Sequence, residues 1–433
     1  MALQFKNPIQ QQQQQPQQSN INYSIGNMGI PMAPQGMPLG IPYISKVNKL
    51  IFQAPPPIEM PGSGLKRAVN YYADYGGCGM WRMVWPENLL NAYNKAVVNG
   101  LTTMIVDERF YNGLNAVRLQ RQATPHQLEF VKFLKHIQPK YGFKILYEID
   151  DVIFREDIPE YNRCKDAFIS DDIARCSKEI MSMCDEVSVT CSYMKEYYRE
   201  KTGNQNITVI PNYPPKFWFQ GLYNKDRLLN TFKENKDRPR IIYTGSGTHI
   251  DVINRANQQD DFAHVVDYII ATRKEFKWVF MGCFPIKCKP FIDTGEMEFH
   301  NWKQMYDYPQ GIYDLNGSVS IAPLIDNRFN RAKSNIKYLE AANLGIPCVC
   351  QDFETYEIAP KELKFNTGIE MINKIRSLTK DIKTYEAMSD YVYKDSQTML
   401  LNDHLDEYTE LYFTPYGSKE RKALLKNNPE QAT

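Results

Sequence analysis

The sequence predicts an α/β protein made of two units, each a mostly parallel sheet with helices on both faces. Three observations predict this class: apolar runs alternate with amphipathic segments, the alternation lapses around residues 214–238, and it then restarts. Two such units enclose a cleft, and ligands bind at the carboxyl ends of parallel strands. The predicted parts are a first domain at 65–214, a linker at 215–238, a second domain at 239–400, and a C-terminal helix and tail at 401–433.

Residues 1–64 differ in composition from the rest of the chain. They hold six consecutive glutamines (Gln10–Gln15), ten prolines and only four charged residues. Such a segment buries too little apolar surface to offset the entropy lost on ordering. The composition predicts a disordered, low-complexity tail, which either recruits a partner or is passive.

The first unit alternates between strands and helices. Its predicted strands span 65–74, 101–107, 115–122, 143–151, 186–190 and 206–212. Its predicted helices span 87–100, 124–142 and 171–184, and a fourth begins at Ser192. Thr124 followed by Pro125 is typical of a helix start, and Gly100 is typical of a helix end. The glycine-rich stretch 75–86 is expected to be a loop.

The second unit repeats this alternation. Its predicted strands span 240–245, 277–282, 297–302, 318–324 and 347–350, and a helix is expected at 260–276. Another helix is expected to start near Asn335, with Ser334 as its N-cap and with Gly345 and Pro347 at its end. Beyond about residue 370 the pattern is helical.

The bulk composition excludes some classes of function. The net charge is +1, so no overall field draws the chain to nucleic acid or to acidic membranes. The nine cysteines and six histidines lack the spacing of a metal site, so no metal is expected. Free thiols and the lack of a long apolar run predict a cytoplasmic protein, in the host cytoplasm if the source is viral.

A glycine-containing loop follows the first strand of the second unit. Glycines there let the backbone approach a ligand closely, and the polar side chains beside them suit a phosphate or a sugar. Ile250 takes the place of the third glycine of a dinucleotide fingerprint, which argues against a dehydrogenase. A lone histidine is more often structural than catalytic. The residues of this loop are Gly245, Ser246, Gly247, Thr248 and His249.

The segment from Lys333 to Glu340 joins a strand to a helix. Lys333, Ser334 and Asn335 lie at the expected helix start, where free N–H groups and a cation would bind an anion. Glu340 lies roughly 9 Å further along the axis, about the reach from a diphosphate to a ribose. The alternative is a solvated turn with a Lys337–Glu340 ion pair.

The loop 75–86 carries residues that suit an acceptor. Backbone amides at Gly76 and Gly77 can approach an acceptor or a diphosphate, Trp81 could stack on a sugar, and Arg82 could pair with a phosphate. Core packing is the alternative for the tryptophans of this loop.

Asp150 and Asp151 end a buried strand at the cleft. Adjacent side chains point in opposite directions there, so at most one aims into the cleft. That carboxylate could accept a proton from an acceptor hydroxyl, and the alternative is that it caps the following turn.

Four stretches together resemble the GT-B-type glycosyltransferases of family 4, and a bacterial and phage subgroup most closely: "YTGSGTH", "YEIDD", "VIPN" and "APLIDNRFNRAKSNIKYLEAANLGIPCV". The resemblance spans about residues 66–400. It implies two Rossmann-like domains, a nucleotide-sugar donor held mainly by the second, retention of anomeric configuration, and no metal or permanently bound cofactor. By the same resemblance Glu340 holds the donor ribose, Lys333 contacts the diphosphate, and Ser334 and Asn335 lie near the transferred sugar.

Two positions depart from the pattern of this family. Ala332 stands where the family has a glutamate, eight positions before Glu340, and the family's arginine is missing from "TGSGTH". We expect Asp326 or His249 to take over these contacts. Asp150, Asp151 and His249 are the candidate catalytic residues.

The expected function is therefore transfer of a sugar to a hydroxyl group. Hydroxymethylated pyrimidines of phage DNA are a candidate acceptor, with Lys66, Arg67 and the basic stretch 135–144 on the DNA phosphates. Two alternatives stay open: a binding or structural protein that keeps the GT-B shape without catalysis, and a sugar-nucleotide epimerase.

Overall fold

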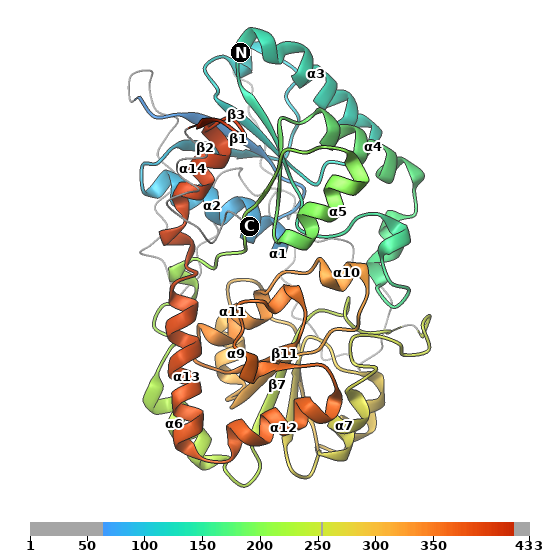
Figure 1. Cartoon of the computed structure of the whole chain (residues 1–433), viewed down its shortest axis with the longest axis vertical. Helices are drawn as coiled ribbons and strands as arrows, with labels where there is room; N and C mark the ends of the chain where they lie inside the picture. Colours follow the sequence, from blue (N-terminus) through green and yellow to red (C-terminus); the bar gives the residue numbers. More distant parts are fainter. Residues whose placement is uncertain (1–63, 253, 420–433) are drawn as a thin grey trace, which may run out of the picture.

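Two parallel six-stranded sheets lie one above the other (Figure 1). The computed structural model describes residues 64–252 and 254–419. The predicted disordered tail falls outside the described residues, except for Gly64, as does the end of the predicted C-terminal tail. In the part described, the predicted class is confirmed: α/β, with two Rossmann-like domains.

The first sheet has the strand order β2-β1-β3-β4-β5-β6. Its strands are β1 (Arg67–Tyr71), β2 (Val97–Leu101), β3 (Ala116–Gln120), β4 (Lys144–Glu148), β5 (Glu186–Val189) and β6 (Ile207–Val209). Its helices are α1 (Gly77–Gly79), α2 (Trp85–Ala92), α3 (Pro125–Tyr141), α4 (Asp171–Met183) and α5 (Ser192–Thr202). Thr124 caps α3 as predicted: its side chain accepts a hydrogen bond from the Gln127 amide.

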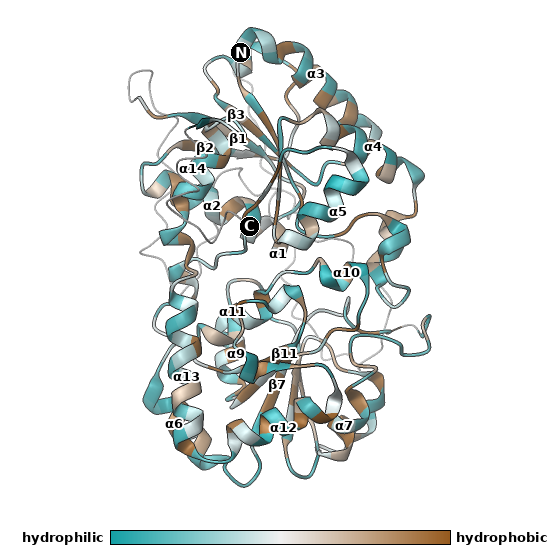
Figure 2. Ribbon diagram, in the orientation of Figure 1, coloured by the Kyte–Doolittle hydropathy of each residue, from teal (hydrophilic) through white to brown (hydrophobic). Residues whose placement is uncertain are grey.

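The second sheet has the order β12-β11-β10-β7-β8-β9. Its strands are β7 (Arg240–Thr244), β8 (Lys277–Met281), β9 (Glu298–His300), β10 (Val319–Ala322), β11 (Cys348–Gln351) and β12 (Lys364–Phe365). The helices of this half are α6 (Lys225–Glu234), α7 (Val266–Ala271), α8 (Lys289–Asp293), α9 (Tyr308–Asp314), α10 (Arg328–Arg331), α11 (Ile336–Ala342), α12 (Gly368–Thr379) and α13 (Ile382–Gln397). Strands are mostly apolar and the outward faces of helices polar, as Figure 2 shows, so each sheet lies inside its domain.

The last helix returns to the first domain. After α13, which packs on α6 and α11, the chain crosses over, and α14 (Leu405–Phe413) packs on α2, β3 and β4 (Figure 1). The Tyr412 hydroxyl donates to Asn70 Oδ1 at 2.6 Å, and Lys144 Nζ donates to the Leu411 carbonyl at 2.7 Å. The C-terminal helix thus ties the two domains together.

The start of the first domain differs from its prediction. The stretch 75–86 is helical rather than a loop, because α1, the π-helical turn η1 (Met80–Val84) and α2 follow one another directly. Helix α2 ends at Ala92, and β2 begins at Val97, so the predicted helix 87–100 and strand 101–107 were wrong. Gly100 lies in β2 against the Tyr72 ring, where a Cβ would collide with that ring. The glycine serves a close packing contact, not a helix end.

Two further segments differ from their predictions. The helix predicted at 260–276 is confined to α7, because the chain from 254 to 265 forms irregular turns around buried acids. The predicted linker contains α6, which packs against α13. In the described part of the chain no helix is long and apolar enough to cross a membrane, and all nine cysteines are free.

Three of the fully buried charged side chains of the first domain form one cluster. Glu148 pairs with Arg82 at 2.6 Å and also with Arg118. Arg82 further donates to the Ile210 carbonyl at 2.6 Å, and Arg118 contacts the ring of Tyr412 in α14. One carboxylate therefore balances two guanidinium groups between the sheet, η1 and the C-terminal helix.

Glu148→Ala should unfold the protein more easily, because it leaves two buried guanidinium groups without their carboxylate. We expect a loss of about 3–5 kcal/mol in the free energy of unfolding, measured by urea denaturation. The exposed Glu129, paired with Lys132 on α3, is the control, and Glu129→Ala should cost less than about 1 kcal/mol. Equal losses for the two variants would contradict the role given to Glu148.

Candidate active site

The order of strands in each sheet sets the position of the site. In the first sheet the chain leaves β1 toward β2 on one side and later toward β3 on the other; in the second it leaves β7 toward β8 and later β10. Such points of reversal open a crevice at the carboxyl ends of the strands. Contacts between the loops that follow these ends join the two domains, so the cleft lies between both crevices.

The predicted glycine loop lies at the crevice of the second domain. Gly245 follows β7 directly, and its amide donates to the Met281 carbonyl at 3.1 Å. A Cβ on Gly245 would lie 2.9 Å from Lys337 Nζ and closer still to the Tyr243 hydroxyl. The Ser246 and Thr248 hydroxyls hydrogen-bond each other at 2.7 Å. The glycine is therefore needed for close packing against Lys337 and Tyr243. The approach of its backbone to a ligand stays a prediction.

Lys337 and Glu340 lie beside this loop, where each affects the charge of the other; Glu340 is buried and Lys337 half-buried. Lys337 Nζ donates to the Thr244 carbonyl at 2.9 Å, and the Glu340 carboxyl hydrogen-bonds Tyr308. Burial lowers the pKa of Lys337, and burial raises the pKa of Glu340, although each group partly offsets the shift of the other. The pair is therefore not the solvated surface pair of the alternative reading.

Lys333 crosses the cleft to the first domain. Its Nζ lies 3.3 Å from Asp151 Oδ1 and 4.2 Å from the centre of the Phe329 ring. Burial opposes its charge, but Asp151 and Asp261 together raise the pKa of Lys333 above its usual value. Lys333 therefore holds a positive charge at the cleft, where the sequence expected one.

His249 belongs to a network that includes both domains. Its Nδ1 lies 2.7 Å from Asp261 Oδ2. The other oxygen of Asp261 accepts from the Tyr161 hydroxyl at 2.8 Å and from Asn330 Nδ2 at 2.5 Å. Tyr161 comes from the first domain, so the orientation of His249 depends on a contact that crosses the cleft.

His249 is neutral at physiological pH. Burial lowers the pKa of its imidazole to about 4, and the positive charges of Lys337 and Lys333 act in the same direction, while Asp261 opposes them. A neutral ring that donates from Nδ1 to Asp261 keeps the lone pair of Nε2 as an acceptor. His249 can therefore accept a hydrogen bond from a sugar hydroxyl or a water.

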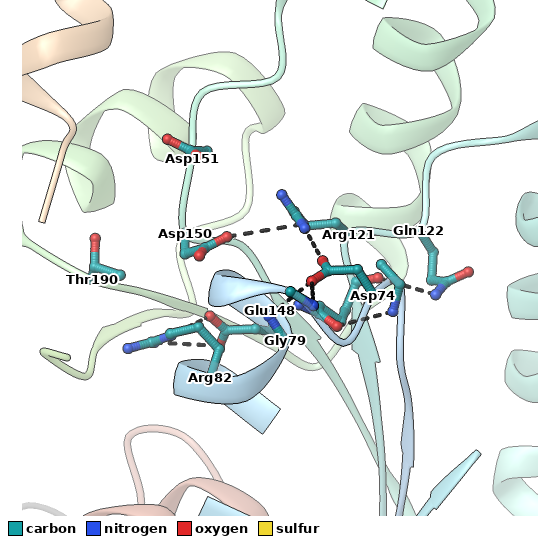
Figure 3. A network of polar contacts seen from close by, with 12 residues as sticks. Asp74, Gly79, Arg82, Arg121, Gln122, Glu148, Asp150, Asp151 and Thr190 are labelled. Atoms are coloured by element: carbon teal, nitrogen blue, oxygen red, sulfur yellow. Dashed lines mark hydrogen bonds and ion pairs between the residues drawn. The ribbon is translucent and has the colours of Figure 1, made fainter. Parts of the chain in front are cut away.

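The two predicted acids point in different directions (Figure 3). Asp150 faces Arg121 of its own domain, with 3.9 Å between Oδ1 and Nε, whereas Asp151 pairs with Lys333. Arg121 also pairs with Asp74, whose Oδ1 accepts from the Gly76 amide at 2.7 Å. The two acids thus pair with different cations, although a carboxylate oxygen of each lies within 4.8 Å of one on the other. The expectation that at most one of them aims into the cleft stays a prediction.

Asp150 has the acidity of a general base. Burial raises the pKa of its carboxyl to about 6, Arg121 opposes this shift, and Asp151 adds to it. Its side chain is only 9% exposed. A carboxylate of this kind is ionised near neutral pH, yet it is more basic than a surface aspartate.

Cys78, Asp150 and Asp151 form the cluster in the described residues that could hold a metal ion. Their candidate ligand atoms lie within 4.8 Å of one another. Burial and the neighbouring acids raise the pKa of the Cys78 thiol well above its usual value, although Arg121 opposes them. Arg121 and Lys333 already place positive charge on the two carboxylates. A divalent ion would have to compete with both cations and with the thiol proton.

Two predicted acceptor contacts were wrong. Trp81 is 2% exposed and packs against Trp85 and Trp218, so the core reading of the tryptophans holds. Arg82 is fully buried with Glu148 because η1 turns it into the domain. Gly76 and Gly77 do lie at the cleft end of β1, and a Cβ on Gly77 would meet Met305 of the second domain at 3.9 Å.

The start of α11 also differs from its prediction. The N-cap is Asn335 rather than Ser334, and no side chain caps this seven-residue helix. Asp326 does not replace the missing glutamate, because it is 61% exposed and pairs with Arg331 at 2.6 Å. The cations of the site are therefore better placed than the helix end to bind an anion.

The residues expected to contact DNA phosphates lie away from the cleft. Lys66 and Arg67 are at the amino end of β1, and Lys144 begins β4, so all three are at the opposite edge of the sheet. Lys135 and Lys140 pair with Asp185 and Glu108. The prediction that these residues contact an acceptor in the cleft was therefore wrong.

Several residues of the site were missed in the sequence. Asp261 falls in a segment read as a helix, and Arg121 was read as the end of a strand. Lys337 was seen only as half of a surface pair. Paired acids after the polar run 251–259 were the available signal for Asp261. The others are Tyr161, Arg163, Asn330 and Asp74, whose importance depends on contacts between segments distant in the sequence.

Solved structures with a similar fold are known. HepE (Alr3699) from Anabaena in complex with UDP has a TM-score of 0.52 and 10% sequence identity, covering 80% of this chain and 99% of that chain. Its complex with UDP-glucose has a TM-score of 0.51 and 9% identity, over 79% and 99%. A mutant of T4 phage BGT in complex with UDP-glucose has a TM-score of 0.46 and 11% identity, over 82% and 100%.

The likeness to HepE is one of fold. It confirms the predicted GT-B architecture of two facing Rossmann-like domains. No protein-family model matches the sequence, and no curated protein matches it either. Family 4 membership therefore stays a prediction.

The acidity of His249 gives a test of the network around Asp261. Its folded-state pKa of about 4 lies below the usual value of about 6.5, so the unfolded chain binds the extra proton between these pH values. Stability should fall as pH drops from about 6.5 to 4, by up to about 3 kcal/mol from this group. His249→Asn should remove that part of the slope, measured by urea denaturation at several pH values.

Replacement of the exposed His126 on α3 is the control for this measurement. His126→Asn should leave the slope as in the wild type. A slope that is unchanged in His249→Asn would mean that the imidazole is not held neutral by its surroundings.

Proposed function

We propose that this protein transfers a sugar from a nucleotide-sugar to a hydroxyl acceptor. One observation carries the proposal. Asp150, a buried carboxylate of the first domain, lies next to Asp151, and Asp151 contacts Lys333 of the second domain, which carries the cation-lined glycine loop. A donor diphosphate needs positive charge, and an acceptor hydroxyl needs a base. This cleft supplies both, one from each domain.

The chemistry follows from these charges. The bond between the anomeric carbon and the diphosphate oxygen breaks, and Lys333 and Lys337 stabilise the charge that develops on that oxygen. The acceptor oxygen forms the new bond to the anomeric carbon on the face that the diphosphate leaves, and it gives its proton to Asp150. His249 accepts a hydrogen bond from the donor sugar. Closure of the cleft limits hydrolysis by water.

Glu340 is proposed to bind the donor ribose. Its carboxyl hydrogen-bonds Tyr308 and lies near the charge of Lys337, whose Nζ binds the carbonyl at the end of β7, next to the glycine loop. A carboxyl in such a place can accept hydrogen bonds from both hydroxyls of a ribose. The fold of HepE, solved with UDP and with UDP-glucose, supports a nucleotide-sugar as the donor.

Stereochemistry and metal use are further parts of the proposal. The resemblance to family 4 supports retention of the anomeric configuration, and the side-chain cations can neutralise a diphosphate without a metal. We expect a product with the anomeric coupling constant of the donor by proton NMR, formed at an unchanged rate in EDTA. An inverted product, or activity restored only by a divalent ion, would correct these parts.

The function is tested with a panel of nucleotide-sugars. Each is incubated with the full chain, with and without hydroxyl acceptors that include sugars, peptides and DNA containing hydroxymethylated pyrimidines, and nucleotide release is followed. Release that depends on an acceptor is expected. A changed sugar without an acceptor would indicate an epimerase, and neither binding nor release would indicate a protein without catalysis.

Asp150→Asn should slow transfer about 10²- to 10⁴-fold, because the amide cannot accept the proton. Donor affinity should change little, since Asp150 faces the acceptor side. The measurement is kcat together with the Kd of the donor. Asp171→Asn, an exposed change in the first turn of α4, is the control. Full activity of Asp150→Asn would rule out its role as the base.

Glu340→Gln should weaken donor binding at least about tenfold, because the neutral amide replaces one acceptor with a donor against the ribose. Calorimetric titration with the preferred nucleotide-sugar measures this change. Glu354→Gln, at an exposed partner of Arg331, is the matched control. An unchanged Kd in Glu340→Gln would refute the ribose contact.

A further inference from the structure

Arg163 brings an unpaired positive charge from the first domain to the glycine loop of the second. A Cβ on Gly247 would lie 3.5 Å from Cζ and from Nη1 of Arg163. The side chain is half-buried, and no hydrogen bond or ion pair joins its guanidinium to another of the residues that the structure describes. A guanidinium that packs against a bare glycine backbone and has no carboxylate partner is free to bind an anionic ligand.

The residues around Arg163 fix it in this place. Two positions before it, the Tyr161 hydroxyl donates to Asp261 of the second domain at 2.8 Å. Three positions after it, Asp166 accepts from Arg255 Nη1 of the second domain at 2.8 Å. Between them, the Asn162 side chain caps the short helix η4 (Arg163–Phe168). We call residues 161–166 the clasp; it positions Arg163 only when the domains are together.

The surroundings of Gly247 are already positive. Lys337 lies next to Gly245, and Lys333 lies across the cleft from Asp151. Their effect is visible on His249: after burial, these two lysines are the charges that lower its pKa. Arg163 adds a third cation. The acids nearby are already engaged, Asp261 by four donors or partners and Glu340 by Lys337 and Tyr308.

We propose that Arg163 binds the diphosphate of the nucleotide-sugar donor, so that the first domain completes the donor site of the second when the cleft closes. The inference rests on the proposed function and adds to it a donor-binding residue from the opposite domain. A diphosphate fits because the planar guanidinium fork can hold two phosphate oxygens at once, and because the cations around the glycine loop can neutralise its two negative charges. Neutral parts of the donor, its base and its sugar, gain nothing from a cation here.

The test compares ligands that differ only in the diphosphate. Wild-type protein is titrated calorimetrically with UDP, GDP, ADP and CDP, and the tightest of these is then compared with its nucleoside and with inorganic pyrophosphate. Arg163→Gln should weaken the binding of the nucleoside diphosphate and of pyrophosphate about ten- to a hundredfold. Nucleoside affinity should stay within about twofold of wild type, because the base and ribose are bound by other residues.

Arg155→Gln is the matched control, since Arg155 is an exposed arginine of the same loop region, in the turn η3 (Arg155–Asp157). It changes the net charge equally and should leave every affinity as in the wild type. Equal losses in the two variants would reduce the effect to general electrostatics. The assignment would also be overturned if the Arg163→Gln protein bound the nucleoside diphosphate as tightly as wild type. It would equally be overturned if the affinity for the nucleoside fell as much as the affinity for the nucleoside diphosphate.

The clasp gives a second arm to the test. Tyr161→Phe removes one hydrogen bond between the domains. It should weaken binding of the nucleoside diphosphate but leave the affinity for the nucleoside unchanged. Because both changes act on one contact, the losses in the double variant Tyr161→Phe, Arg163→Gln should be less than additive. Strictly additive losses would contradict positioning of Arg163 by the clasp. A wild-type protein that binds no nucleoside diphosphate would overturn the proposed function itself, and the wild-type titration alone would reveal that.

Discussion

The hydrogen bonds of Asp261 hold the site together. This fully buried carboxylate of the second domain accepts hydrogen bonds from Tyr161 of the first domain and from Asn330 of α10, and it pairs with His249 of the loop after β7. Three segments far apart in the sequence thus meet on one pair of oxygens. A buried carboxylate is stable only when such partners are present. The closed arrangement of the domains and the orientation of His249 therefore depend on each other.

The positive charges of the cleft are the counterpart of this network. Lys333, Lys337 and Arg163 gather around the glycine loop, and only part of their charge is balanced by acids of the protein. Binding of an anionic ligand would therefore lower the electrostatic free energy of this site. Burial is the main cause of both shifted pKa values. It lowers the pKa of His249, where the two lysines add to the shift, and it raises the pKa of Asp150, where Arg121 opposes the shift and Asp151 adds to it.

The fold was largely readable from the sequence, whereas the site was readable only in its local parts. Alternating apolar runs gave ten of the strands near their true positions, since each depends on its own side chains. The predicted helix at 87–100 failed because its last residues, Val97–Gly100, are apolar enough for either structure and tertiary pairing with β1 decides. The positions of Gly245, Lys333, Asp150 and Asp151 at the carboxyl ends of their strands follow from local geometry. Tyr161, Arg163 and Asp261 depend on the contact between the domains, and no local pattern encodes it.

The central claim is that the two domains together bind one nucleotide-sugar at the glycine loop after β7. A crystal structure of the full chain with a bound nucleoside diphosphate would test it most directly. We expect the diphosphate to lie against Gly245–Gly247 within hydrogen-bond distance of Lys333 or Lys337 and of Arg163, with the ribose at Glu340. A nucleotide bound outside the cleft, or one held by the second domain with Arg163 turned away, would contradict it.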